Sequence, residues 1–149
     1  MCFVFYGLRP DKGGNGEFRG GCGIERSRTL TALNSTLSIL AERMKIRPWV
    51  LEEGGGGVLG EYRLIKRSGE TLTLPSKCTV QIKEGDTRVV HTPGGGKIGD
   101  PRKRAPQSVL RDVLNGLVSP ESAERYYGLD QGRKGGCKAA PSAQGWALK

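Results

Sequence analysis

Glycine is the feature that most constrains this chain, because 24 of its 149 residues are glycine. Most of them gather in three short segments, residues 13–23, 54–60 and 94–99. Glycine lacks a Cβ atom, so it weakens helix interiors and adopts turn conformations that other residues avoid. The glycines show no three-residue collagen period. We therefore expect many tight turns between short strands.

The segments between the glycine clusters carry strand signals. Residues 2–6 (CFVFY) are mostly β-branched or aromatic and are followed by Gly7 and Pro10, so we expect a strand there. Residues 60–75 alternate around Ser68-Gly69, and residues 78–92 alternate around the turn at residues 84–86. Each pattern is typical of a β-hairpin. The middle of the chain is therefore predicted to be β.

Residues 24–44 fit two patterns. Leucines at positions 30, 33, 37 and 40 suit one stripe of a helix. Several threonines and serines with alternating Leu37 and Ile39 suit two strands that meet at an Asn34-Ser35 turn. We favour the two strands.

The end of the chain changes character. Residues 105–116 have apolar residues at helical spacing before Gly116, and residues 119–128 begin with Ser119-Pro120 and end at Gly128, which are helix start and stop signals. Past Leu129 no periodicity remains. We expect a mainly β, glycine-rich fold of strands and hairpins with two short C-terminal helices, α+β overall. Residues 1–129 are expected to form a single domain and residues 130–149 a flexible basic tail.

Charge, cysteine spacing and the first residues of the chain indicate the cellular compartment that we expect. The net charge is +9, and the four cysteines (Cys2, Cys22, Cys78 and Cys137) are scattered without a C-x-x-C pair. This spacing is untypical of a disulfide framework. The first residues lack a basic region before their apolar run, and no segment is long enough to span a membrane. We expect a cytoplasmic protein with no membrane partner.

The loop TPGGGKIGDP at residues 92–101 superficially resembles a phosphate-binding loop. A P-loop with this glycine-lysine pair needs glycine at position 91 and Ser or Thr at position 98, but the chain has His91 and Ile98. Gly55, Gly57 and Gly60 match G-x-G-x-x-G, yet a strand-like segment follows where a helix is required. We interpret the loop at residues 92–101 as a hinge between the β region and the helices.

The residue types needed for chemistry are sparse. His91 is the only histidine, and we expect it at the surface or in a turn. A catalytic zinc site uses about three protein ligands, so no metal site is predicted. No nucleophile with a base is apparent, and the catalytic residues remain unassigned. Basic residues cluster weakly at residues 97–104 and in the tail without a nucleic-acid-binding motif, so we expect no nucleic-acid partner.

Five ordered motifs resemble those of one family. They are DKGGNGEFRGGCGIER at residues 11–26, RPWVLEEGGGG at 47–57, LPSKCTVQIKEGD at 74–86, TPGGGKIGDP at 92–101 and VLRDVLNGLVSPESAERYYGL at 109–129. The first is similar to the pattern D-S-G-G-x-G-x-x-R-G-G-x-G-x-x-R, and the fourth to T-P-G-G-G-G-x-G-D-P, with Lys97 in place of the fourth glycine. On these motifs the chain resembles the hydantoinase B / 5-oxoprolinase B family, which includes the large subunits of acetone- and acetophenone-type carboxylases.

The resemblance implies a function that this chain would share with other polypeptides. Members of the family run to several hundred residues, and only their C-terminal end is similar to this chain. The implied function is that of a C-terminal segment or small subunit of an ATP-dependent hydrolase that opens hydantoin or 5-oxoproline, or of a related ketone carboxylase, inactive alone. The implied partners are a hydantoinase A-type subunit and the missing N-terminal part of hydantoinase B, with a homo-oligomer also possible. The chain is expected to bind no cofactor itself, while ATP and a metal ion belong to the whole complex.

Two arginines are the candidates for a substrate or phosphate contact. Arg19 and Arg26 lie in or beside the first glycine-rich motif, where a guanidinium group can present its fork to a carboxylate or phosphate. The alternative is that each ties a loop to a carbonyl or an acidic neighbour. We interpret the following glycines as structural: Gly13, Gly14, Gly16, Gly20, Gly21, Gly23, Gly94, Gly95, Gly96 and Gly99. The competing hypotheses for the whole chain are a non-enzymatic basic interaction or nucleic-acid-binding protein, and a truncated gene product.

Overall fold

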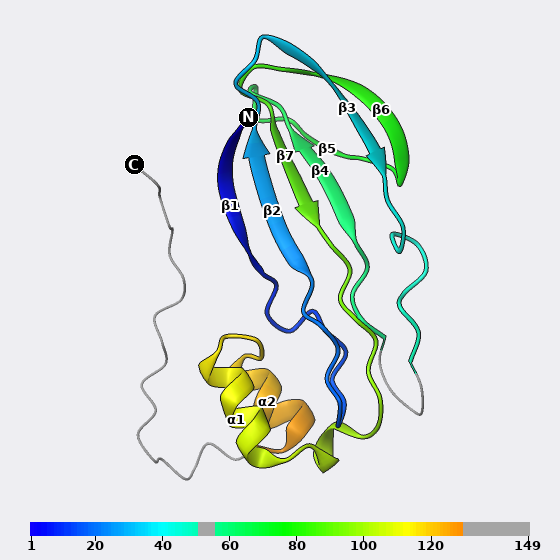
Figure 1. Cartoon of the computed structure of the whole chain (residues 1–149), viewed down its shortest axis with the longest axis vertical. Helices are drawn as coiled ribbons and strands as arrows, with labels where there is room; N and C mark the ends of the chain where they lie inside the picture. Colours follow the sequence, from blue (N-terminus) through cyan, green and yellow to red (C-terminus); the bar gives the residue numbers. More distant parts are fainter. Residues whose placement is uncertain (51–55, 130–149) are drawn as a thin grey trace.

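The structure is a computed structural model that describes residues 1–50 and 56–129. Strands fill one end of the molecule and two short helices fill the other, with extended segments running between them (Figure 1). The predicted tail, residues 130–149, lies outside the described residues. The mainly β, α+β fold class predicted from the sequence is confirmed.

The larger sheet has five antiparallel strands in the order β1-β2-β7-β4-β5. Their bounds are β1 Cys2–Leu8, β2 Ile24–Thr29, β7 Thr87–His91, β4 Glu61–Ile65 and β5 Thr71–Thr73. The strand predicted at residues 2–6 is therefore β1, which forms one edge of this sheet. Because β7 lies in the centre with β2 and β4 on either side, residues from distant parts of the sequence become neighbours across it.

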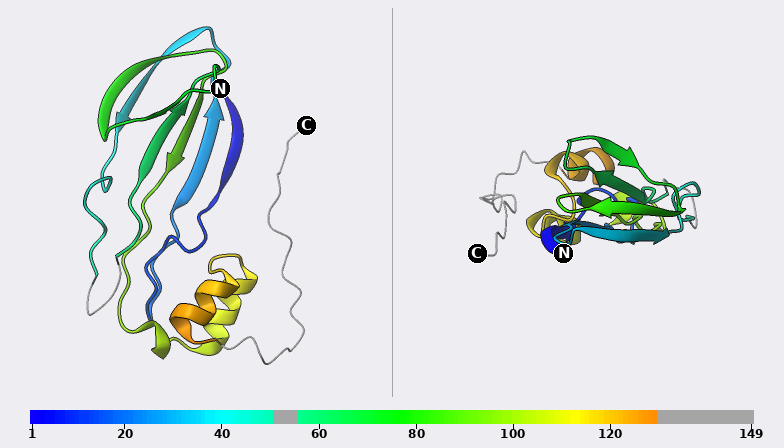
Figure 2. Two further views of the ribbon diagram at one scale, coloured as in Figure 1. Left: turned by 180° about the vertical axis from the view of Figure 1, so that it is seen from behind. Right: turned by 90° about the horizontal axis from the view of Figure 1, so that it is seen from above.

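The remaining two strands, β3 (Asn34–Leu40) and β6 (Lys77–Lys83), pair with each other as an antiparallel ribbon. The ribbon continues the β2–β7 pair almost in register, since Thr29 lies opposite Thr87 and Asn34 opposite Lys83. At the interruption between the two ladders the ribbon turns back over the β4–β5 side of the sheet (Figures 1 and 2). The β region is therefore built as two layers.

The main hydrophobic core lies between these layers. Side chains alternate along the ribbon, so that Leu37, Ile39 and Ile82 are buried while their sequence neighbours are exposed. They pack with Leu64 on β4 and with Leu74, which follows β5. Leu64 is only 1% exposed, which makes it the centre of this core.

One predicted hairpin is confirmed and the other two expected strand pairs are wrong. The turn at Ser68-Gly69 joins β4 to β5, and Gly69 takes a φ of 90°, which suits glycine. The strands on either side of residues 30–33 do not pair, because β2 pairs with β1 and β7 whereas β3 pairs with β6. For the same reason the turn at residues 84–86 joins strands of different sheets. In the observed pairing the inner apolar residues of β3 and β6 share one core with Leu64, and burial of this apolar surface favours the arrangement.

The two helices predicted at the end of the chain are present. They are α1 (Pro106–Leu114) and α2 (Pro120–Tyr127), preceded by a short 3-10 turn, η1 (Pro101–Lys103). The Ser119 hydroxyl accepts a hydrogen bond from the Ser122 N–H, and Gly128 ends α2 with a φ of 68°. Val109, Val118, Ala123 and Tyr127 form a second, smaller core between these helices. In residues 1–50 and 56–129, the helices are too short or too polar for a bilayer crossing.

Candidate functional site

Three glycine-rich segments meet between the sheet and the helices, and we call them the glycine junction. They are residues 11–23, 56–60 and 92–100. The Gly14 N–H donates to the Gly95 carbonyl at 3.0 Å, and the Gly95 N–H donates to the Gly21 carbonyl at 2.8 Å. The third segment joins through Val58, whose carbonyl accepts from the Gly94 N–H at 3.0 Å. These backbone donors are satisfied by facing carbonyl groups, so they are not presented to a phosphate.

The junction is so closely packed that several positions have no room for a side chain. A Cβ atom on Gly94 would overlap the backbone carbonyl oxygen of Lys12, and one on Gly96 would overlap that of Trp49. A Cβ atom on Gly20 would overlap the Gly95 carbonyl. Gly21 is different, because nothing lies within 4 Å of its Cβ position. Most of these glycines therefore serve the approach of one backbone to another.

Lys97 does not reach out of the TPGGGKIGDP loop. Lys97 is only 7% exposed, and its Cβ atom packs against Gly16 on the first glycine segment. A phosphate-binding lysine must present its ammonium group to the ligand beside free backbone N–H groups. The geometry of this loop therefore fits a packed connection and does not fit a nucleotide phosphate.

Arg19, one of the two candidate arginines, ties the junction to the helices. Its Nε atom lies 3.1 Å from Asp112 Oδ2 on α1, and its Nη1 atom donates to the Gly20 carbonyl at 2.7 Å. The side chains of Arg19 and Asp112 are 15% and 10% exposed. Burial disfavours the charged guanidinium group, but the hydrogen bond with Asp112 and the favourable electrostatic interactions with Cys22, Asp112 and Tyr127 together outweigh it, so the pKa of Arg19 is raised.

A second arginine shares the same carboxylate. Arg104 Nη2 lies 3.0 Å from Asp112 Oδ2, and Arg104 Nη1 donates to the Glu17 carbonyl at 2.7 Å. Asp112 thus holds two arginines, one from the first glycine segment and one from the turn before α1. We call this three-residue group the Asp112 latch. Its hydrogen bonds are directed inward, which matches the alternative in which Arg19 ties a loop to an acidic neighbour.

Arg26, the other candidate, is in a different place. It lies on β2, opposite Tyr6 of β1 and Val90 of β7, on the sheet rather than in the junction. In the part of the chain that the structure describes, no carboxylate is within ion-pair distance of its guanidinium group. The structure therefore does not bring Arg19 and Arg26 together into one site.

His91 is buried, which contradicts the expected surface or turn position. It is the last residue of β7, and both neighbouring strands place a glutamate directly opposite it. Its Nδ1 atom lies 3.3 Å from Glu61 Oε2, and its Nε2 atom lies 3.2 Å from Glu25 Oε2 without hydrogen-bonding geometry. Because β7 is central, the two carboxylates enclose the imidazole, and His91 is only 9% exposed. No local signal in the sequence points to this trio, since the pairing partners are far apart along the chain.

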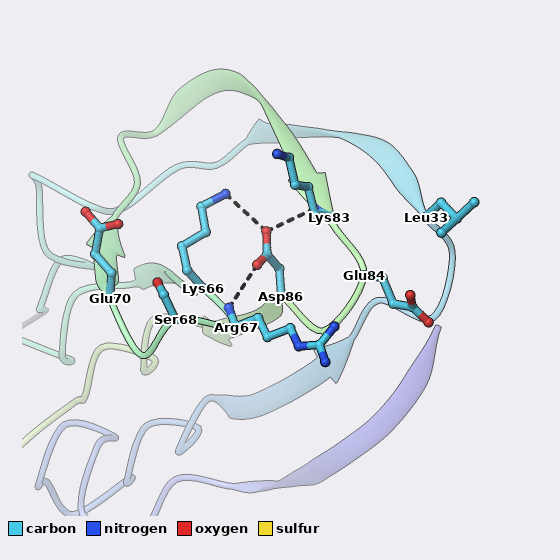
Figure 3. Close-up of a pocket in the computed structure, with 8 residues that line it drawn as sticks. All are labelled: Leu33, Lys66, Arg67, Ser68, Glu70, Lys83, Glu84 and Asp86. Atoms are coloured by element: carbon cyan, nitrogen blue, oxygen red, sulfur yellow. Dashed lines mark hydrogen bonds and ion pairs between the residues drawn. The ribbon is translucent and has the colours of Figure 1, made fainter.

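A polar pocket lies at the far end of the β region, between the turns at residues 66–69 and 83–86 (Figure 3). Asp86 forms its floor, and the Asp86 carboxylate accepts hydrogen bonds from Lys66 Nζ at 3.1 Å and from the backbone N–H groups of Arg67 and Lys83 at 3.0 Å each. Burial opposes the charge on Asp86, but these three donors outweigh it and lower its pKa. The carboxylate is fully engaged, so this arrangement pins two turns together.

A metal site needs several ligands in one place. Within residues 1–50 and 56–129, no three His, Cys, Asp or Glu side chains are grouped so that they could hold a metal ion. Cys2, Cys22 and Cys78 are free thiols. Reasoning from the sequence missed Asp112 and Arg104 of the Asp112 latch. Arg19 and Asp112 are 93 residues apart, so no local pattern connects them.

Comparison with known proteins gives a consistent assignment. The family described as Hydantoinase B/oxoprolinase matches residues 1–101. An uncharacterized protein of Methanocaldococcus jannaschii is 41% identical over 122 residues, which are 82% of this chain and 21% of that protein. A putative D-/L-hydantoinase subunit of the B type, from a Pseudomonas species, is 32% identical over 126 residues, which are 83% of this chain and 21% of that protein.

A solved structure has the same fold. The crystal structure of the ATP-dependent caprolactamase from Pseudomonas jessenii is similar with a TM-score of 0.64 and 28% sequence identity, over 84% of this chain and 22% of that chain. This chain spans about a fifth of the length of each of these three proteins. With a family match over residues 1–101 and the same fold in a solved relative, the chain belongs to the hydantoinase B/oxoprolinase family.

Proposed function

We propose that this chain is the C-terminal segment or small subunit of a hydantoinase-B-type protein, in an ATP-dependent complex that opens cyclic amides. The observation that carries the proposal is the pattern of coverage: more than four fifths of this chain matches about one fifth of a hydantoinase subunit and of an ATP-dependent caprolactamase. Hydantoin and caprolactam are both cyclic amides. A segment shared by proteins named for both substrates supports a common ring-opening chemistry.

Within such a complex the chain contributes architecture. The glycine junction and the Asp112 latch hold the sheet at a set position relative to the helices. The junction does not fit the phosphates of ATP, because the N–H groups of Gly14, Gly94 and Gly95 already bind facing carbonyl groups and Lys97 is buried. We therefore place ATP binding and bond breaking in the polypeptides that accompany this chain, and we expect the chain alone to be inactive.

Complementation of a known relative tests the proposal. The β subunit of the Pseudomonas jessenii caprolactamase contains a segment that is 36% identical to this chain over 131 residues. The caprolactamase subunits are co-expressed with this segment removed from the β subunit, and this chain is supplied as a separate polypeptide. We expect ATP-dependent caprolactam hydrolysis only when the chain is present, and none from the chain alone with caprolactam, hydantoin or 5-oxoproline. Two outcomes contradict the proposal: substantial turnover by the isolated chain, or a complex that forms with it and gains no activity.

Carboxylation of a ketone is the other reaction that the resemblance to this family implies. A parallel complementation of an acetone carboxylase that lacks the equivalent segment, assayed with acetone, bicarbonate and ATP, separates the two reactions. Restored carboxylation of acetone, together with no restored hydrolysis in the caprolactamase complex, would replace the hydrolase proposal with the carboxylase.

A further inference from the structure

Three arginines lie together on one face of the five-stranded sheet. Arg26 and Arg28 are two residues apart on β2, so their side chains point to the same side. Arg88 on β7 lies directly opposite Arg28. Like charges placed directly opposite each other on neighbouring strands destabilise a sheet. The chain therefore carries a charge arrangement that its own folding disfavours.

The described residues provide no anion for this group. Among residues 1–50 and 56–129, no carboxylate lies within ion-pair distance of the three guanidinium groups. The Nε atoms of Arg28 and Arg88 are buried and have no hydrogen-bond partner in that same part of the chain. Burial and the neighbouring charges of Arg26 and Arg28 lower the pKa of Arg88. An external group of negative charges would remove this cost.

Exposed aromatic side chains flank the arginines on the same face. Phe3 lies opposite Arg28 and Tyr6 opposite Arg26 in the β1–β2 register. The Arg28 guanidinium carbon is 3.8 Å from the centre of the Phe3 ring, which orients the arginine over the aromatic surface. Phe3 is 54% exposed and Tyr6 is 63% exposed. We call Phe3, Tyr6, Arg26, Arg28 and Arg88 the arginine–aromatic face.

The β1–β2 part of this face is accessible. Arg88 lies opposite both Arg28 and Leu64, so the arginines share the face of the sheet that carries the main core. The β3–β6 ribbon covers this face on the β4–β5 side, whereas Phe3 and Tyr6 on β1 are exposed (Figures 1 and 2). β1 is also an edge strand, so its outer row of backbone groups is not paired within the sheet. Its exposed apolar residues continue the surface: Met1, Val4 and Leu8.

The composition and shape of the face favour a protein partner. Arginine and aromatic residues are enriched at protein interfaces and among the residues that contribute most binding energy. Guanidinium groups bind carboxylates through paired hydrogen bonds. None of these five residues lines the polar pocket near Asp86.

We propose that the arginine–aromatic face docks a carboxylate-rich surface, with apolar side chains beside it, on the remaining part of the hydantoinase-B-type protein. The identity of this occupant rests on the proposed function, since this chain spans only about a fifth of each of the three relatives described above. Carboxylates of the partner complete the ion pairs that the described residues do not supply to Arg28 and Arg88. Phe3 and Tyr6 supply the apolar area of the interface.

Binding to the trimmed caprolactamase β subunit, co-expressed with its partner subunit as above, tests the docking face. The wild-type chain is compared with R28E/R88E and with R102E/R111E, a matched charge reversal at exposed positions of η1 and α1. We expect R28E/R88E to weaken binding about 100-fold, as for the loss of close interfacial charge pairs, and R102E/R111E to change it less than about 3-fold. Equal binding by the wild type and R28E/R88E would overturn the proposal.

A milder variant separates docking from folding. R88Q removes one of the two opposed charges, so we expect the isolated chain to melt at a higher temperature while its binding weakens about 10-fold. Loss of binding together with a lower melting temperature would instead indicate a structural role and would contradict the docking face. Far-UV circular dichroism of each variant checks that the strands are retained.

Other occupants and the proposed function are separated by the same material. Light scattering measures whether the chain associates with itself. If it does, and if R28E/R88E abolishes the association, the face binds a second copy of the chain and the proposed occupant is wrong. Poly(U) binding that R28E/R88E abolishes would assign it to RNA. If the wild-type chain binds the trimmed subunit without restoring hydrolysis, docking stands and the proposed function fails. If R28E/R88E restores hydrolysis as well as the wild type does, the docking face fails and the proposed function stands.

Discussion

The two-layer β region and the glycine junction are held together in opposite ways. In the β region, apolar side chains such as Leu37, Ile82 and Leu64 fill the space between the ribbon and the sheet. In the junction, the absence of side chains lets three backbone segments touch, as at Gly94 and Gly96. The first region is sensitive to lost volume and the second to added volume. A substitution that removes volume should therefore destabilise the β region, whereas one that adds volume should destabilise the junction.

A methyl group added to the junction should have the largest effect. In G94A the new Cβ atom meets the backbone carbonyl of Lys12, which cannot move without displacing the first glycine segment. We expect a loss of about 4 kcal/mol in the free energy of unfolding, at the upper end for overpacking. G21A is the matched control, because nothing lies within 4 Å of its Cβ position. Urea denaturation of both variants decides the point: similar midpoints would mean that the junction is not closely packed.

Removal of volume from the β core should cost somewhat less. L64A leaves a cavity where a residue that is 1% exposed packs between the two layers. We expect a loss of about 3 kcal/mol in the free energy of unfolding. L40A removes the same atoms from a residue of the ribbon that is 85% exposed, and it should stay within about 0.5 kcal/mol of the wild type. A comparable loss in L40A would show that the outer side of the ribbon is buried in solution.

The Asp112 latch should have an intermediate effect that separates the helices from the sheet. D112N keeps the shape of the side chain and removes the charge that holds Arg19 and Arg104. We expect a loss of about 2 kcal/mol because two partly buried guanidinium groups lose their anion. Hydrogen exchange should speed up in α1 and α2 more than in β7. Equal acceleration everywhere would contradict the latch, and E121Q on exposed α2 surface serves as the control.

The smallest effect is expected at Asp86, and it depends on pH. D86N should cost about 1.5 kcal/mol at pH 7, because the amide replaces one of the two oxygens that bind Lys66, Arg67 and Lys83. The pKa of Asp86 is lower in the folded chain than its usual value of 3.8, so the carboxylate stabilises the fold above that value. This contribution is lost as the pH falls through the folded pKa.

Urea midpoints between pH 7 and pH 2 measure this dependence. The difference between the wild type and D86N should shrink as the pH falls below about 4. E84Q, at an exposed position of the same turn, should follow the wild type at every pH. A difference for D86N that stays constant down to pH 2 would contradict a lowered pKa for Asp86.

Local patterns were sufficient for the elements themselves. The β4–β5 hairpin followed from alternation around Ser68-Gly69, and α2 followed from Ser119 and Gly128 at its two ends. Each of these signals acts between residues close in sequence, so a single sequence is enough to detect it. The strand character of residues 24–29 and 34–40 was also expected, but the assumption that they pair with each other was wrong.

The candidate site was less predictable because it depends on residues far apart in sequence. Arg19 and Arg26 looked equivalent in the first motif, yet Arg19 is bound to Asp112 while Arg26 lies on the sheet near Arg88. His91 was placed at the surface, and only its central strand position encloses it between Glu25 and Glu61. No local pattern carries this information.

By itself, the sequence determined where strands, turns and helices occur, and its ordered motifs identified the family. Strand propensity, helix capping and alternation of apolar residues are local properties, so they can be identified without knowing which strand is the partner. Only the tertiary structure decided which strands pair, what the glycines contact and which arginines remain without an anion in the described residues. These outcomes depend on contacts between residues far apart in sequence: the apolar side chains of the β3–β6 ribbon pack over Leu64, and the β2–β7 pair places Arg28 opposite Arg88.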